Sequence, residues 1–273
     1  MRRIVDDLAY WALLAVIGLV AAFLLLPICA VIIMSLDARG FMGSFPPTGF
    51  SLRWYEALIA DDLYLRGAQV SVVLAVLSTL ISTVAGVSAA VALDRNHFLG
   101  KRALEALLLS PLIVPAVVMG FSLLLFLSTL GVVDGRVRLL AGHVLITFPY
   151  IVRTTLASLA GLRPSFTEAA MSLGATERWA FWSVTFPLAR TGIVAGAIFA
   201  FAFSMDDVAV SVFLTSPDVF TLPVAMASMM RTSFDLKIAA VSVVLAAVTA
   251  GLVVLLDRTV GLEKVIGSGV FRS

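Results

Sequence analysis

Six long apolar segments dominate this sequence and leave room only for short connections between them. They lie at roughly residues 11–35, 69–93, 106–130, 139–160, 191–214 and 238–256. A helix of about 20 apolar residues spans the hydrocarbon core of a bilayer, where an unpaired backbone cannot face lipid. The alternating pattern of a membrane β-barrel is absent from these segments. The sequence therefore predicts an all-α membrane protein with six transmembrane helices.

Composition favours one membrane domain and argues against several other classes of protein. Of the 273 residues, 61% are hydrophobic and 13% are charged, whereas soluble domains are about 25% charged. We therefore expect residues 1–273 to form a single transmembrane domain in contact with lipid. The net charge of +2 is too small to indicate nucleic-acid binding. One Cys and two His, far apart in the chain, predict neither an internal disulfide nor a metal site.

The N-terminus and the distribution of basic residues predict the topology. The first apolar run follows Arg2 and Arg3 but, at about 24 residues, is too long for the apolar region of a signal peptide. We therefore expect it to remain as the first span. Lys and Arg favour the cytoplasmic side of a membrane, and the short connection at residues 94–102 contains two Arg and one Lys. This bias predicts that both termini and the segment 161–190 are cytoplasmic.

The polar segment 161–190, between the fourth and fifth apolar runs, predicts two short helices held at a fixed angle. Ser165 and Glu168 have the spacing of a capping box, which begins a helix. Gly174 ends that helix in a left-handed conformation that other residues adopt only at a cost. A second helix, rich in aromatic residues, follows, and Pro187 marks the entry to the next span. Two short helices at a fixed angle form a rigid segment, which can transmit a movement that a flexible loop would absorb.

The spacing within this segment resembles the EAA loop of ABC importer permeases. The string EAA at residues 168–170 is followed after three residues by Gly174 and, after nine more, by V-x-F-P, where the family has I-x-L-P. The resemblance implies that residues 165–187 dock on an ATPase subunit. The residues expected at this contact are Glu168, Ala169, Ala170, Leu173, Gly174 and Ala175. In the alternative interpretation, Glu168 only caps a helix and the aromatic residues only form an interfacial belt.

The chain from about residue 10 to residue 262 resembles the permease subunits of spermidine/putrescine-type ABC importers. Three strings carry the resemblance, namely FSLRWY at 50–55, SPLIVP at 110–115 and SMDDVAVS at 204–211. It implies a type I importer fold in a bacterial inner membrane, with this chain forming half of the translocation path. The implied partners are two ABC ATPase subunits, a second, homologous permease and an extracytoplasmic solute-binding protein. The same branch handles polyamines, opines, aminophosphonates and other small amine-bearing solutes.

Two adjacent acids, Asp206 and Asp207, lie inside the fifth apolar run. A charge at the bilayer centre costs at least about 2.5–3.5 kcal/mol, so such groups usually face a cavity and carry function. Consecutive helical side chains point about 100° apart. Either one carboxylate therefore lines the path while the other bonds a neighbouring helix, or the helix unwinds there. With Ser204, the two acids are our candidates for the path of a cationic solute; alternatively, they only bond polar groups within the bundle.

Other polar or aromatic residues have structural interpretations. We expect His143 to form hydrogen bonds between helices, as buried polar side chains in membranes commonly do. Pro111 and Pro115 predict a kink in the third span. Trp54 and Tyr55 fall in a short amphipathic stretch and are expected at the level of the lipid headgroups.

These observations predict a permease subunit of an ATP-driven importer, for polyamines or another small amine-bearing solute. The chain has no Walker A phosphate loop, so ATP is expected on a partner and no cofactor on this chain. We do not expect an enzyme. A membrane enzyme would need a cluster of reactive side chains, and the acids within the predicted spans are limited to the adjacent pair Asp206 and Asp207. An ion-coupled secondary transporter that uses Asp206 or Asp207 remains the alternative.

Overall fold

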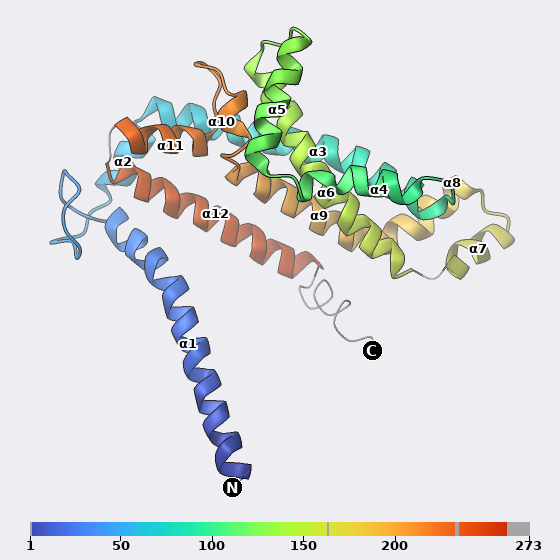
Figure 1. The fold of residues 1–273 in the computed structure, drawn as a ribbon, viewed down its shortest axis with the longest axis horizontal. Helices are drawn as coiled ribbons and strands as arrows, with labels where there is room; N and C mark the ends of the chain where they lie inside the picture. Colours follow the sequence, from blue (N-terminus) through green and yellow to red (C-terminus); the bar gives the residue numbers. More distant parts are fainter. Residues whose placement is uncertain (1, 163, 233–234, 261–273) are drawn as a thin grey trace. The chain divides into compact units, whose positions relative to one another are not determined.

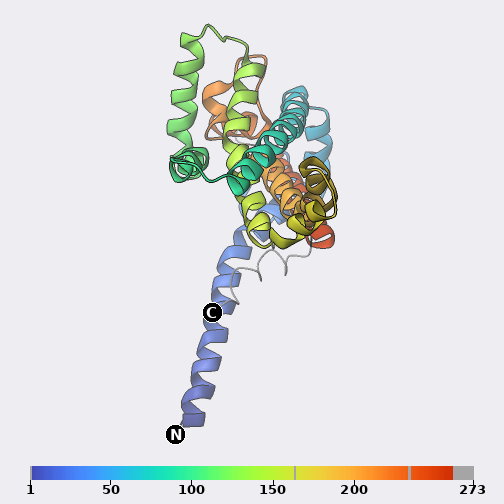
Figure 2. The same cartoon turned by 90° about the vertical axis from the view of Figure 1, so that its right-hand side faces the viewer.

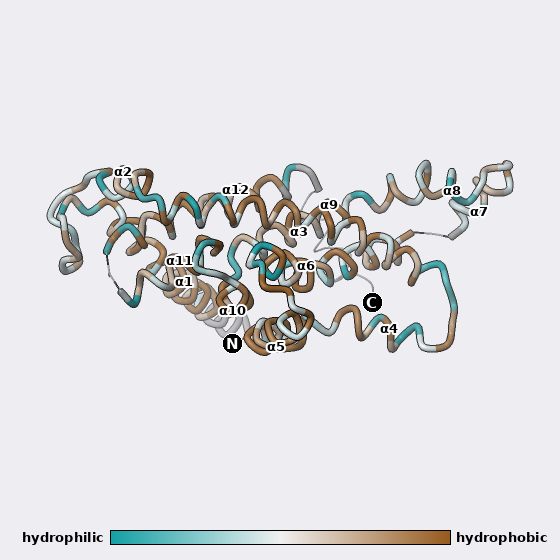
Figure 3. Tube along the Cα trace, turned by 90° about the horizontal axis from the view of Figure 1, so that it is seen from above, coloured by the Kyte–Doolittle hydropathy of each residue, from teal (hydrophilic) through white to brown (hydrophobic). Residues whose placement is uncertain are grey.

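Helices form most of the chain that the computed structural model describes, which is residues 2–162, 164–232 and 235–260 (Figure 1). Five helices are long and apolar enough to cross a membrane, and a bent pair makes a sixth candidate. The five cover Tyr10–Ser35 of α1 (Arg2–Ser35), α3 (Asp62–Arg95), α6 (Gly135–Ala160), Glu177–Asp206 and Lys237–Leu255 of α12 (Lys237–Val260). Hydrophobic residues predominate along these helices, and hydrophilic residues gather at the connections between them (Figure 3). The predicted all-helical membrane fold is confirmed.

The third apolar segment is not one straight span. It consists of α4 (Lys101–Leu109) with the short η1 (Ser110–Leu112), and then α5 (Ala116–Thr129), bent by 103° at the break. Figure 2 shows α5 rising steeply from the end of α4. Pro115 causes the break because its ring blocks a continuous helix, and it adopts an extended conformation instead. The predicted kink is confirmed, and the third apolar segment extends from Lys101 to Thr129 instead of the predicted 106–130.

The fifth apolar segment also differs from its predicted bounds of 191–214. The helix begins at Glu177 with α8 (Glu177–Ala180), continues through the π-helical turn η2 (Phe181–Thr185) and becomes α9 (Phe186–Asp206). Pro187 therefore does not separate a loop helix from a span. It lies in the first turn of α9, directly after the π turn, where the hydrogen-bond ladder is already shifted. The chain then leaves the helix after Asp206 and forms the separate α10 (Ser211–Leu214).

Contacts group the chain into two compact units, Met1–Asp62 with Met229–Ala247 and Leu63–Ser228 with Val248–Ser273. The first unit contains α2 (Arg53–Ile59), whose Trp54 is buried against Leu236 and Ala240. The prediction of Trp54 at the lipid headgroups is therefore wrong. The residue is buried because its indole N–H donates to the carbonyl of Asp37 at 2.8 Å. That polar bond offsets the cost of burying the indole N–H.

The Asp37 carboxylate is fixed within the same unit. The Arg39 guanidinium donates to it from Nε at 2.8 Å, and the Asp37 side chain is fully buried. This hydrogen bond holds the pKa of Asp37 below its usual range. Tyr55 also stays within the unit, since its hydroxyl lies 2.8 Å from Ser35 Oγ. The connection after α1 is thus an ordered segment.

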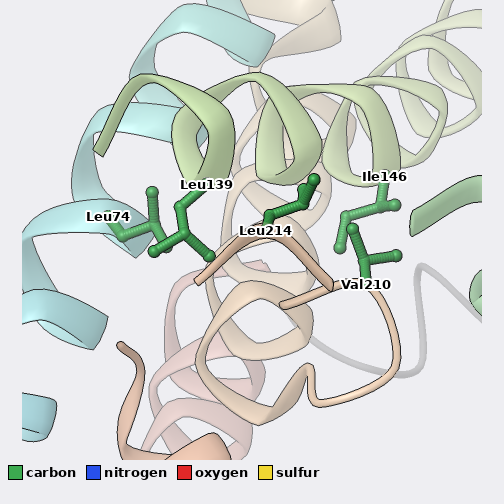
Figure 4. Close-up of a cluster of buried hydrophobic side chains, with 5 residues drawn as sticks. All are labelled: Leu74, Leu139, Ile146, Val210 and Leu214. Carbon is green, nitrogen blue, oxygen red and sulfur yellow. The ribbon is translucent and has the colours of Figure 1, made fainter. Parts of the chain in front are cut away.

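The second unit has its core where α10 packs against α3 and α6. Figure 4 shows this cluster, in which Val210 and Leu214 contact Leu74, Leu139 and Ile146. Further along α6, α9 approaches so closely that only glycine fits between the backbones. A Cβ on Gly196 would lie 3.3 Å from the Cα of Ile151 and would clash with Thr154 Oγ1. Small residues at membrane helix contacts allow this proximity.

A larger side chain at Gly196 should force α9 away from α6. We expect Gly196→Leu to destabilise the folded protein by about 1–3 kcal/mol, because overpacking a close contact displaces both backbones. Gly18→Leu is the matched control, since a Cβ there meets nothing within 4 Å. The thermal midpoint of each purified protein measures the difference. Equal midpoints for the two variants would contradict the close contact.

Candidate functional site

The end of α9 separates the two adjacent acids. Asp206 is the last residue of α9 and its side chain is exposed, whereas Asp207 has an extended backbone and is 7% exposed. The helix therefore ends between the two carboxylates and directs them to different surroundings. Of the arrangements that the sequence left open, the one in which the helix is interrupted is observed.

The buried Asp207 carboxylate receives hydrogen bonds from the segment that follows it. Ser211 donates to it from its backbone N–H at 2.9 Å and from its hydroxyl at 2.8 Å. The backbone N–H of Val210 donates at 3.2 Å. The first N–H groups of a helix have no partner within that helix, so Asp207 satisfies those at the start of α10. These hydrogen bonds compensate for the cost of burying the Asp207 carboxylate, so Asp207 has a structural role.

His143 on α6 joins this arrangement from the other side. Its Nδ1 lies 2.7 Å from Ser204 Oγ of α9, and its Nε2 lies 2.9 Å from Ser211 Oγ of α10. The predicted interhelical hydrogen bonds of His143 are confirmed. Ser204 is only 2% exposed. Among the three candidate path residues, Asp206 alone is exposed in this chain, while Ser204 and Asp207 belong to the buried network.

The segment 161–190 contains α7 (Pro164–Ser172) and then a sharp reversal at Gly174. Gly174 has a φ of +91°, which confirms the predicted left-handed conformation. The N–H of Ala175 donates to the carbonyl of Ala170 at 3.1 Å, and the N–H of Gly174 donates to that of Met171 at 2.9 Å. This pair of bonds is a Schellman motif, which ends a helix and fixes the direction of the next residues.

The start of α7 differs from the prediction. The helix begins at Pro164, so Ser165 lies within the first turn and the predicted capping box with Glu168 is wrong. Proline favours the first helical position because its missing N–H would have no partner there. The second helix has the cap instead, since Thr176 Oγ1 accepts from the backbone N–H of Trp179 at 3.3 Å. The end of α7 is thus fixed by the Schellman motif, and the start of α8 is fixed by the Thr176 cap.

The tip of this segment exposes apolar and small side chains. Leu173 is 90% exposed, and Glu168, Ala169 and Gly174 are exposed beside it. Ala170 and Ala175 are half-buried. Exposed apolar side chains that gather at one place usually mark an interaction surface. The six residues predicted at the ATPase contact therefore lie along one turn and its flanks.

Arg95, at the end of α3, holds the second short helix in place. Its guanidinium donates to Glu177 Oε1 at 3.0 Å and to Thr185 Oγ1 at 3.3 Å, and lies 5.4 Å from the centre of the Phe181 ring. An open groove of about 660 Å³ lies beside these contacts, between α3 and the α8–α9 helix. Sequence reasoning used Arg95 only as a topology signal. Its partners are about 80 residues away, and no local pattern could identify them.

Comparisons with known proteins agree with this architecture. The chain belongs to the family described as the binding-protein-dependent transport system inner membrane component, which matches residues 82–262. It is accordingly a multi-pass component of an inner-membrane transport system.

Individual relatives come from several bacteria. The chain is 33% identical over 248 residues, which are 91% of this chain and 93% of the relative, to the spermidine/putrescine transport system permease protein PotC of Shigella flexneri. It is 30% identical over 227 residues, 81% of this chain and 80% of the relative, to the putrescine transport system permease protein PotI of Escherichia coli (strain K12). The trehalose transport system permease protein SugB of Mycobacterium tuberculosis (strain CDC 1551 / Oshkosh) is 29% identical over 227 residues, 82% of each chain.

Among solved structures, a bacterial alginate ABC transporter in complex with its periplasmic protein has a similar chain. The TM-score is 0.73 at 16% sequence identity, and the match covers 93% of each chain. At this identity the likeness concerns the fold alone, which is that of an ABC importer permease.

Proposed function

We propose that this chain is the permease subunit of an ATP-driven importer of polyamines or another small amine-bearing solute. The observation that carries the proposal is Asp206, an exposed carboxylate at the end of a predominantly apolar membrane helix. The identity to PotC over most of both chains supports the same solute class. Family membership alone is insufficient, because the trehalose permease SugB is 29% identical. The carboxylate therefore adds an independent reason for a cationic solute.

Asp206 acts through its charge. A carboxylate in a cavity of low dielectric constant attracts an ammonium group and repels anions. A charged residue on a membrane helix faces a water-filled cavity or a partner far more often than lipid. Asp206 therefore identifies the face of α9 that lines the path, and Asp207 fixes the connection from α9 to α10.

The tip around Gly174 is the docking site for an ABC ATPase, which binds the ATP. Exposed Leu173, the small residues on either side of it and the rigid reversal support this role. The complete importer contains two ATPase subunits, a second permease that supplies the other half of the path, and an extracytoplasmic solute-binding protein. Both termini and the tip are on the cytoplasmic side, as the distribution of Lys and Arg indicates.

Removing the charge of Asp206 should reduce transport strongly. We expect Asp206→Asn to lower amine uptake per assembled complex by at least about tenfold, because the substitution keeps the shape and removes the attraction. Asp218→Asn is the control, since Asp218 is an exposed acid that follows α10. Uptake of radiolabelled putrescine into proteoliposomes, normalised to complex, measures both. Normal uptake by Asp206→Asn would rule out charge recognition at this residue.

Straining the reversal at Gly174 should uncouple the ATPase. A β-branched residue at this positive φ costs about 1–2 kcal/mol, so Gly174→Val should distort the tip and lower solute-stimulated ATP hydrolysis while membrane insertion stays normal. Gly131→Val provides the matched control, because Gly131 has a φ of +74°, equally open surroundings and a place in the α5–α6 connection. The docking role is untenable if both variants hydrolyse ATP like the unmodified complex.

Cysteine labelling tests the orientation. In a Cys29→Ala background, we expect Asp218→Cys to react with an impermeant maleimide added to intact cells. Ser172→Cys, exposed at the end of α7, should react only after the membrane is opened. Labelling of Ser172→Cys from outside would invert the topology and remove the ATPase contact.

The energy source of uptake distinguishes the proposed importer from an ion-coupled secondary transporter that uses Asp206 or Asp207. It would take up solute without an ATPase partner, in response to an ion gradient alone. The importer proposal predicts that uptake stops when the ATPase subunit cannot hydrolyse ATP.

A further inference from the structure

A chain of buried hydrogen bonds connects four helices of the second unit. It runs from Asp207 to Ser211 Oγ at 2.8 Å, then to His143 Nε2 at 2.9 Å. From His143 Nδ1 it continues to Ser204 Oγ at 2.7 Å, and from there to Ser78 Oγ at 3.3 Å. His143, Ser211 and Ser78 are fully buried, and Ser204 and Asp207 are 2% and 7% exposed.

The chemistry of the groups gives this chain a direction. A carboxylate only accepts, so the single hydroxyl proton of Ser211 is committed to Asp207. Ser211 Oγ must then accept from His143, so Nε2 carries a proton, and in the neutral tautomer Nδ1 does not. Nδ1 becomes the acceptor and receives the hydroxyl proton of Ser204. One tautomer of His143 therefore satisfies every contact along the chain.

The two ring contacts of His143 lie on opposite sides of Asp206 in the sequence. Ser204 precedes Asp206 by two residues, and Asp207, anchored through Ser211, follows it directly. Asp206 is thus the exposed residue between two buried anchors. The backbone at Asp206 is therefore held on both sides, while the two ring nitrogens of His143 bond Ser204 and Ser211.

We infer that His143 is the positioning residue for the Asp206 carboxylate. It does not meet the solute, because its side chain is completely buried. It holds the end of α9 on one side and the start of α10 on the other, and so sets where the charge is presented. This inference rests on the proposed role of Asp206 in solute recognition for its functional consequence, but its structural part stands alone.

Two conservative variants divide the contacts of the ring. In His143→Asn the amide reaches the place of Nδ1 and keeps the bond to Ser204, while in His143→Gln it reaches that of Nε2 and keeps the bond to Ser211. Thr147→Val is the matched control, one turn along α6. Thr147 is also fully buried, bonds Ser82 of α3 at 2.7 Å and donates to the backbone carbonyl of His143 at 2.6 Å. Its removal therefore takes away a buried hydroxyl beside His143 but leaves both ring contacts in place.

The direct test measures the freedom of position 206. A nitroxide attached to Asp206→Cys in a cysteine-free, assembled complex should give narrower EPR lines, and thus faster motion, in His143→Asn and His143→Gln. Thr147→Val should leave the spectrum unchanged. An unchanged spectrum in both His143 variants, or the same change in Thr147→Val, would overturn the inference whether or not Asp206 recognises the solute.

The functional test is a double-mutant cycle. Each His143 variant should lower amine uptake per assembled complex by about fivefold with a raised KM, and by less than about twofold when Asp206 is already Asn. Thr147→Val should have the same small effect in both backgrounds. Equal losses from the His143 variants in both backgrounds would reduce His143 to a packing role. Normal uptake by Asp206→Asn with a changed EPR spectrum would retain the positioning and reject the proposed function.

Discussion

The fold of the second unit around α9 and α10 depends on hydrogen bonds to one buried carboxylate, that of Asp207. Asp207 follows an apolar helix, and burying an unpaired charge costs far more than a folded domain can tolerate. The chain meets this need by leaving the helix and turning the N–H groups of Val210 and Ser211 toward the carboxylate. His143 and Ser204 complete the arrangement. The termination of α9, the exposure of Asp206 and the packing of α10 on α6 all follow from it.

The helix that carries Asp206 begins within the segment 161–190, which is proposed to dock on the ATPase. The helix Glu177–Asp206 is continuous over 30 residues, a length of about 45 Å at 1.5 Å per residue. Arg95 holds its first turns against α3, and Gly196 brings its middle close to α6. A movement imposed near α8 therefore acts on a stiff element whose far end bears the exposed acid. In the proposed importer, this single helix directly connects the ATPase docking site to the carboxylate that recognises the solute.

Sequence reasoning predicted those parts of the structure that local chemistry determines. Apolar length identified the spans, and the left-handed turn at Gly174 followed from the properties of glycine. The end of α9 at Asp206 was one of two arrangements that the sequence left open. The sequence could not decide between them, because the residues after Asp207 stay mostly apolar and hydropathy does not give the direction of the backbone. Trp54 was misplaced for a similar reason, since its partner is the distant carbonyl of Asp37. The ATPase contact residues stay a prediction.

Asp206 is proposed to face a water-filled path, while its neighbour Asp207 is buried. Reaction with a small, water-soluble methanethiosulfonate measures this most directly in assembled, cysteine-free complexes that carry Asp206→Cys or Asp207→Cys. We expect the cysteine at position 206 to react and transported amine to slow that reaction, while the cysteine at position 207 stays unmodified. Equal reaction at both positions, or no reaction at position 206, would contradict this proposal.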